Sequence, residues 1–299
     1  MRRKLFLIFA AAPVAVCQAA AQVVPGRDLL GYPVGTAGEA PVLSTTGGGG
    51  LWNPASIALT GADRWRVGVG AVDTPASQGL GVQSAWAAAA LPGPVTAGIS
   101  LLRASVRDIV RTDENDPTSR GQLPYGTVLA SAVAATPLSR YVTGGIAVRY
   151  RRGELGALRR GAAGVDGGIL AGGGWWQDLR LGASTVLWRP GASSDEATYS
   201  GGIDLRAAGD DSLAELRVGY AQQVYDGEGA EHYVFGAAHY GGATVRGGIL
   251  ATNEYGTLTR RSRFGLGLRF ASYYVALARE SSPFGDNGTY LFTLTTTSQ

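Results

Sequence analysis

The sequence predicts an all-β protein, a transmembrane antiparallel β-barrel of about fourteen strands that follows an N-terminal hatch segment. Three observations predict this fold. Apolar side chains alternate with Gly, Arg, Glu or Thr through many segments, and short and long connections alternate between those segments. After the N-terminal leader, no uncharged apolar run reaches the roughly 18 residues that indicate a membrane-spanning helix.

The alternation is clearest in residues 264–270, where Phe and Leu side chains alternate with two glycines and an arginine. Residues 65–71, 214–220 and 289–295 have the same period. One face of a helix repeats about every 3.6 residues, so this period indicates strands with one apolar face and one small or charged face. A soluble β-sandwich or propeller alternates as well, but its solvent face would carry far more Lys, Glu and Asp.

Each such segment has about the 9–11 residues that a tilted strand needs to cross a bilayer. The expected strands lie near residues 64–73, 80–91, 95–110, 124–135, 141–151, 160–173, 178–189, 197–207, 213–224, 231–240, 243–252, 261–270, 273–280 and 289–297.

The connections between these strands predict the orientation of the barrel. Short connections are expected at residues 92–94, 136–140, 174–177, 208–212, 241–242 and 271–272. The interleaved connections are mostly longer and more polar, at residues 111–123, 152–159, 190–196, 252–260 and 281–288. Short periplasmic turns and longer extracellular loops are typical of outer-membrane barrels. Both ends of the barrel chain are therefore expected on the periplasmic side.

The first residues have the pattern of a cleaved export signal. Arg2, Arg3 and Lys4 precede an apolar stretch at residues 5–16, and a run of three alanines ends at Ala21. The apolar stretch is too short to cross a bilayer as a helix. We expect residues 1–21 to be removed as a signal peptide, residues 22–62 to form the hatch segment, and residues 63–299 to form the barrel. The expected location is the outer membrane of a Gram-negative bacterium.

Composition argues against several kinds of site. Cys17, in the leader, is the only cysteine, so the mature chain has no thiolate site. Without the three basic leader residues, 23 of the 26 basic residues remain against 23 acidic ones, so nucleic acid is not an expected partner. His232 and His239 lie on opposite faces of one expected strand and cannot share a metal. Residues 113–116 lack the spacing of a calcium loop. No motif favours an enzyme, and we expect no cofactor.

Several arginines fall on the glycine-bearing face of the expected strands. A charge that faces lipid at the membrane midplane costs about 2–4 kcal/mol, so this face is assigned to the lumen. The lumen-facing candidates are Arg66, Arg149, Arg217, Arg246, Arg269 and Glu215, with Asp204 as a further acidic partner. Either these charges pair with one another and pack the lumen, or they select the anionic head of an amphipathic ligand.

Residues 22–62 do not alternate, and a glycine run there is followed by Trp52, Asn53, Pro54 and Ala55. Such a long segment before a barrel is either disordered or folded into the lumen as a plug. Pro54 can begin a short helix that continues to Leu59. The four residues resemble the Asn-Pro-Ala motif of FadL-like long-chain fatty-acid transporters and, more closely, of the PorV/PorQ proteins associated with type IX secretion. Residues 141–150, 164–170 and 179–184 are similar, in this order, to the middle of PorV-like barrels. The resemblance implies a fourteen-stranded barrel whose hatch contains Asn53, Pro54 and Ala55.

Three functional hypotheses remain open. The favoured one is a FadL-like passive transporter or porin for small hydrophobic or amphipathic molecules, and an apolar lumen pocket beside the hatch would support it. The second is a PorV-like barrel that binds secreted proteins for export or surface attachment. The third is a purely structural barrel, which a lumen packed with paired charges would support. The expected partners are outer-membrane lipid and, depending on the hypothesis, a hydrophobic small-molecule ligand or a secreted protein.

Overall fold

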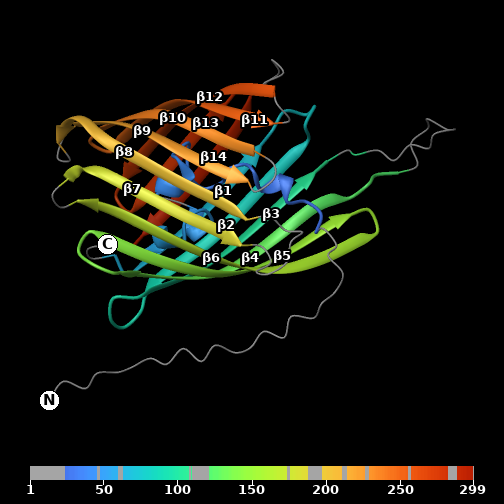
Figure 1. Ribbon diagram of the computed structural model, residues 1–299, viewed down its shortest axis with the longest axis horizontal. Helices are drawn as coiled ribbons and strands as arrows, with labels where there is room; N and C mark the ends of the chain where they lie inside the picture. Colours follow the sequence, from blue (N-terminus) through green and yellow to red (C-terminus); the bar gives the residue numbers. More distant parts are fainter. Residues whose placement is uncertain are drawn as a thin grey trace.

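The computed structural model describes residues 24–45, 48–59, 63–107, 109, 121–173, 176–187, 197–210, 214–225, 229–254, 257–281 and 288–298. The predicted leader, residues 113–116 and the predicted connection at 190–196 lie outside these described residues. Within them, each strand pairs antiparallel with the next, and the last strand pairs with the first to close a barrel of fourteen strands (Figure 1). The predicted fold class and strand number are confirmed.

The strands agree with the predicted segments to within a few residues. They are β1 (Trp65–Asp73), β2 (Leu80–Ala90), β3 (Thr96–Val106), β4 (Tyr125–Pro137), β5 (Val142–Leu155), β6 (Leu158–Gly173), β7 (Trp176–Leu187), β8 (Thr198–Asp210), β9 (Ala214–Tyr225), β10 (Gly229–Tyr240), β11 (Ala243–Glu254), β12 (Thr257–Phe270), β13 (Tyr273–Glu280) and β14 (Thr289–Thr297). We call the end of the barrel where β1 begins and β14 ends the turn end, and the opposite end the loop end. Arg66 and Thr297 pair at the turn end.

The outer surface is apolar along most strands. On β12, Phe264, Leu266 and Leu268 are 53%, 50% and 60% exposed, whereas Gly265 and Gly267 between them are buried on the inside. On β10, Val234 is exposed between the buried Tyr233 and Phe235. A band of exposed apolar side chains is what a strand presents to lipid. The barrel is therefore of the transmembrane type.

Two of the predicted loops are wrong. The sequence predicts loops at residues 152–159 and 252–260 because these connections are long and polar. Instead β5 and β6 continue to residues 155 and 158, and β11 and β12 continue to residues 254 and 257. Gly156, with a φ of 60°, lies in the tight turn between β5 and β6. Beyond the lipid bilayer, both faces of a hairpin are in water and both can carry polar side chains. The alternation of apolar and polar residues is therefore lost, although the backbone pairing of the two strands continues.

The N-terminal segment, described at residues 24–45 and 48–59, lies inside the barrel (Figure 1, blue). It contains four short 3-10 helices, η1 (Asp28–Leu30), η2 (Pro41–Leu43), η3 (Gly48–Gly50) and η4 (Pro54–Ile57). Its first described residues contact the loop-end half of β4 and β5, and Leu59 lies beside Thr96 near the turn end. In the part of the chain that the structure describes, no helix is long and apolar enough to span a membrane.

Candidate functional site

The Asn-Pro-Ala motif lies where the N-terminal segment meets the inner wall. Asn53 is fully buried, and its Oδ1 accepts a hydrogen bond from the Ala55 amide at 3.1 Å, which caps η4. Its Nδ2 donates to Val42 O at 2.8 Å and to Ile169 O on β6 at 3.1 Å. One side chain therefore fixes the start of η4, the path of the segment and its attachment to the wall.

Glycines on the wall make room for this motif. A Cβ at Gly168 of β6 would lie 2.1 Å from Asn53 Oδ1, and a Cβ at Gly145 of β5 would lie 2.3 Å from the carbonyl carbon of Pro54. Both distances are too short for any side chain to fit without a shift of the segment. The glycine-rich character of β5 and β6 thus reflects close approach of two backbones.

Trp52 and Ala55 complete the predicted motif. The Trp52 indole Nε1 donates to Val34 O, 2.9 Å away within the segment, and Trp52 O accepts from Ser184 Oγ of β7 at 2.9 Å. Ala55 is 1% exposed and lies against Gly145. The four motif residues therefore lie where η3 leads into η4, against the wall formed by β5–β7.

Buried arginines attach the segment to the wall through its backbone. Arg149 of β5 pairs with Asp166 and donates to Leu51 O and, at 3.4 Å, to Gly50 O. Arg151, two residues further along β5, donates to Val24 O at 3.0 Å and Pro25 O at 3.1 Å. Both guanidinium groups are buried, where each needs hydrogen-bond acceptors to offset its desolvation. Arg151 was not predicted as a site residue, although it shares the inward face with Arg149.

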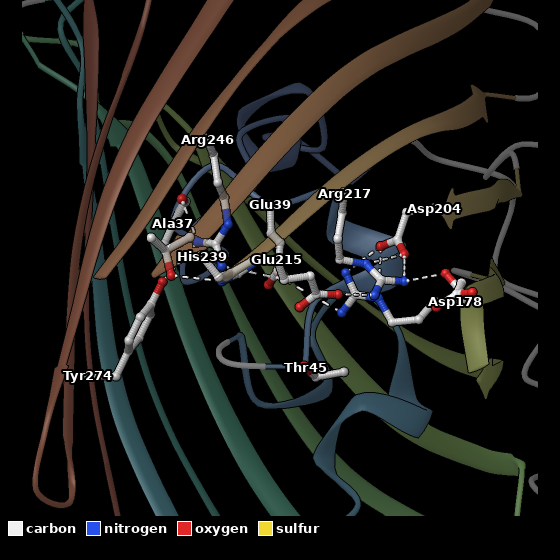
Figure 2. Close-up of polar contacts among 12 residues, drawn as sticks. Ala37, Glu39, Thr45, Asp178, Asp204, Glu215, Arg217, His239, Arg246 and Tyr274 are labelled. Carbon is white, nitrogen blue, oxygen red and sulfur yellow. Dashed lines mark hydrogen bonds and ion pairs between the residues drawn. The ribbon is translucent and has the colours of Figure 1, made fainter. Parts of the chain in front are cut away.

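A charged wall faces the segment from β7–β11, and we define it as Arg180, Asp204, Glu215, Arg217 and Arg246. Figure 2 shows Asp204, Glu215, Arg217 and Arg246 of this wall. The buried Asp204 carboxylate accepts from Arg180 Nε and from Arg217 Nε, at 2.8 Å in each case. Arg217 also pairs with Glu215, and Glu215 lies 3.4 Å from Arg206. These are charge-assisted pairs in a partly dry environment, so they are stronger than surface pairs.

Glu39 connects the N-terminal segment to the charged wall. Its carboxylate lies 3.6 Å from the Arg246 guanidinium and 4.0 Å from that of Arg180. Arg246 also donates to Ala37 O at 3.4 Å and to the Tyr274 hydroxyl at 2.8 Å. In Figure 2, Tyr274, Arg246 and Glu39 lie in one group with Glu215, Arg217, Asp204 and Asp178. Arg180 and Glu39 were not among the predicted lumen residues.

A second charged cluster lies nearer the loop end. Glu280 accepts from Arg263 Nε at 2.9 Å and from Arg261 Nη1 at 2.6 Å, and Arg261 also pairs with Glu231 at 2.7 Å. The Tyr233 hydroxyl donates to Gly38 O at 3.0 Å. Close to this cluster, burial raises the pKa of the Tyr32 hydroxyl above its ordinary value, and the negative charge of Glu280 raises it further.

The opposite side of the lumen is an apolar wall, which we define as Val72, Leu80, Val82, Leu102, Leu129 and Leu291. Leu29, Leu30, Val34 and Leu51 of the N-terminal segment pack against it in one buried cluster. The sequence predicts mainly glycine and charge on this inner face, so the apolar wall is an addition to that prediction. A small cavity of about 60 Å³ lies between Leu30, Leu51, Leu102 and Leu129, with Arg27 and Arg149 among its other lining residues.

A larger cavity of about 630 Å³ lies at the turn end, beneath the segment. Arg66, Arg140, Arg180 and Arg269 line it, and Asp63 is the one acid among its described lining residues. Arg66 donates to Thr45 O at 2.8 Å and lies 3.5 Å from Asp63. The predicted lumen arginines are thus divided between this cavity (Arg66, Arg269) and the contacts with the segment (Arg149, Arg246), while Arg217 lies within the charged wall.

The two histidines lie apart. His232 faces outward, with its Nδ1 2.7 Å from the Tyr220 hydroxyl. The half-buried His239 faces inward, with its Nδ1 3.0 Å from Thr244 Oγ1. In the described parts of the chain, no three His, Cys, Asp or Glu side chains are grouped as a metal site would require.

Comparison with known proteins shows similarity at the level of the fold. No family model matches the chain. No curated protein matches it either. The toluene transporter TodX of Pseudomonas putida superimposes with a TM-score of 0.59 at 12% identity, over 91% of this chain and 100% of that one. A FadL homologue of Pseudomonas aeruginosa gives a TM-score of 0.55 at 11% identity, over 89% of this chain and 98% of that one.

Proposed function

We propose that the protein is an outer-membrane passive transporter for small hydrophobic or amphipathic molecules, with residues 22–62 acting as a hatch. One observation carries the proposal: the described part of that segment covers an apolar wall while its other side is held by ion pairs and hydrogen bonds from the charged wall. Displacing it would expose a surface that an apolar molecule can follow through the barrel.

The charge around the apolar wall supports an amphipathic ligand with an anionic head. Arg27 and Arg149 border the small cavity beside Leu51 and Leu102, and four arginines line the turn-end cavity. A guanidinium group recognises carboxylate well, and an apolar wall accepts the tail. TodX, which has a similar fold, is a toluene transporter, and this favours transport over catalysis as the activity to test first.

Outer-membrane location rests on the exposed apolar band. Trp65, Tyr240 and Tyr273 are 43%, 74% and 46% exposed at the turn end, where aromatic side chains of such barrels meet the membrane interface. Apolar side chains of β10 and β12 lie between this end and the loop end. The loop end would then face the cell exterior and the turn end the periplasm.

A purely structural barrel is the second candidate, because the lumen charges are largely paired and the cavity beside Leu51 is only about 60 Å³. The secretion hypothesis predicts instead a protein-sized groove at the loop end. The predicted loops at 111–123 and 190–196, which would form that groove, lie mostly or wholly outside the described residues. No observation in the described residues favours secretion over transport.

A reversible lock on the hatch distinguishes transport from a structural role. The mature chain is expected to have no cysteine, and a Cβ at Gly168 would lie 3.1 Å from Asn53 Cγ, so the pair Asn53→Cys and Gly168→Cys is close enough to form a disulfide. Asn53→Cys removes the Oδ1 that this Cβ would meet at 2.1 Å, but Pro54 Cδ stays at 2.8 Å, so the pair requires a small shift of the segment. Gly168→Cys alone measures how far that shift by itself changes uptake. We expect proteoliposomes of this variant to take up decanoate and toluene when reduced and to lose uptake when oxidised. The unsubstituted mature chain, treated with the same oxidant, is the control. Uptake at the rate of empty liposomes in both redox states would support the structural barrel.

A further inference from the structure

The lipid-facing surface of β2–β6 is hollowed at mid-height. A groove of about 770 Å³ there is lined by Ala85, Ala87, Ala130, Ala132 and Ala163. Ile99, Leu101 and Tyr150 rise beside these alanines and are 66%, 52% and 55% exposed. The volume is within the range of about 300–1,000 Å³ that is usual for small-molecule sites. The row of small residues therefore leaves space for an acyl chain against the outer wall.

Two arginines stand at the loop-end edge of this groove. Arg103 of β3 and Arg152 of β5 flank Val128 of β4 in one row of the sheet, and both side chains are exposed on the outer face. The adjacent row towards mid-membrane is Leu101, Ala130 and Tyr150, which belongs to the groove. The two arginines therefore lie directly beside the groove on β3, β4 and β5.

Neither guanidinium group has a partner among the described residues. The outward acids near them are already paired: Asp73 lies 4.0 Å from Arg107, and Glu154 lies 3.4 Å from Arg159. Gln83, next to Arg103 in the same row, is also exposed. This part of the outer surface therefore carries excess positive charge.

An outward arginine is tolerated in a barrel only near the level of the lipid headgroups, because the cost of facing lipid falls from about 2–4 kcal/mol at the midplane to about 0–1 kcal/mol at the interface. At that level the strongest partner for a guanidinium group is a phosphate. Tyr150 adds a further donor: its hydroxyl oxygen would lie 2.3 Å from a Cβ at Gly161, which is in the same row as Arg152.

We propose that the outer face of β2–β6 binds a net-negative acyl lipid with a phosphate in its headgroup. An acyl chain lies in the alanine groove, and the phosphate accepts hydrogen bonds from Arg103, Arg152 and the Tyr150 hydroxyl. The proposal rests on the membrane location in the proposed function but not on transport, because the groove is on the opposite side of the wall from the N-terminal segment.

The test is native mass spectrometry of the full mature chain in detergent, titrated with phosphatidylglycerol or with phosphatidylcholine of the same acyl chains. We expect preferential retention of phosphatidylglycerol and a loss of about tenfold or more in its affinity when Arg103→Gln and Arg152→Gln are combined. Arg260→Gln removes an outward, exposed arginine at the loop end of β12 and is the matched control, expected to bind as the unsubstituted chain does.

A second variant tests the groove itself. Ala132→Phe fills it while keeping both arginines, so we expect weaker retention of both lipids. Equal affinity for the two lipids in the unsubstituted chain would overturn the proposal, as would an arginine variant that keeps its preference. A heat-dependent gel shift establishes that each variant is folded, and the redox-controlled uptake assay reports separately on transport.

Discussion

The two sides of the lumen hold the N-terminal segment by different physical means. On the apolar wall, leucines of the segment and of β2–β4 exclude water in one buried cluster. On the charged wall, Glu39 meets Arg180, which is paired with Asp204, and Arg246, which also donates to Ala37 O. Apolar packing is insensitive to small shifts, whereas ion pairs fix position and can be exchanged for other anions. The contacts on the charged side can therefore be released when another anion replaces Glu39. The apolar side offers a surface that an apolar molecule can follow.

The largest effect is expected when the charged wall loses its central acid. Asp204→Ala leaves Arg180 and Arg217 without their shared carboxylate, which should cost about 3–5 kcal/mol of unfolding free energy. Urea unfolding followed by the gel shift measures it. Asp178→Ala is the control, because the Asp178 side chain is 56% exposed and its pair with Arg206 should contribute less than about 1 kcal/mol. Equal losses would show that burial of the pair is unimportant.

Truncation of the apolar wall should be somewhat milder. Leu102 is 1% exposed, so Leu102→Ala creates a cavity under the segment and should cost about 2–4 kcal/mol. Leu101→Ala, at the next residue but 52% exposed to the outside, should cost much less. If the two variants unfold at the same urea concentration, the inner side of β3 does not pack against the segment.

A smaller effect is expected at the motif. Asn53→Ala removes the η4 cap and the donors to Val42 O and Ile169 O, a loss of about 1–3 kcal/mol. Asn53→Asp keeps an acceptor for the Ala55 amide but loses both donated bonds. Hydrogen exchange should accelerate at the Ala55 amide in Asn53→Ala and less in Asn53→Asp. Unchanged exchange in both would argue that the cap is not what fixes η4.

The smallest effect on stability is expected for an ion pair that is exposed to solvent. The Arg159–Glu154 pair is 3.4 Å long, but its side chains are 61% and 43% exposed. Glu154→Gln should change the unfolding free energy by no more than about 1 kcal/mol. A loss as large as that of Asp204→Ala would mean that charge count, not burial, governs the stability of the barrel.

The fold could be predicted from the sequence because a bilayer imposes one pattern on every strand. Lipid on one side and a crowded lumen on the other select a period of two, and that period located β1, β9 and β14 closely. The hairpins β5–β6 and β11–β12 were predicted too short because beyond the membrane no such selection acts, and charged residues there resemble loops.

The lumen was predictable only in part. Arg151 could have been found because it is two residues from Arg149 and shares its face of the strand. Arg180 could have been found in the same way, because it shares a face with Gly182 and Ser184. The apolar wall gives no such signal, because Leu102 faces inward and its neighbour Leu101, of the same residue type, faces outward. The path of the N-terminal segment through short 3-10 turns has no period at all and depends on contacts distant in sequence, such as Asn53 with Ile169.

The most direct measurement for the hatch is single-channel conductance in planar bilayers of the mature chain, with and without residues 24–59. The full chain should show no steady ion current, because the segment fills the space between the two walls. The shortened chain, if its gel shift shows a folded barrel, should conduct through an open lumen. A steady current of equal size from both proteins would contradict an occluding segment, and with it the assignment of residues 22–62 as a hatch.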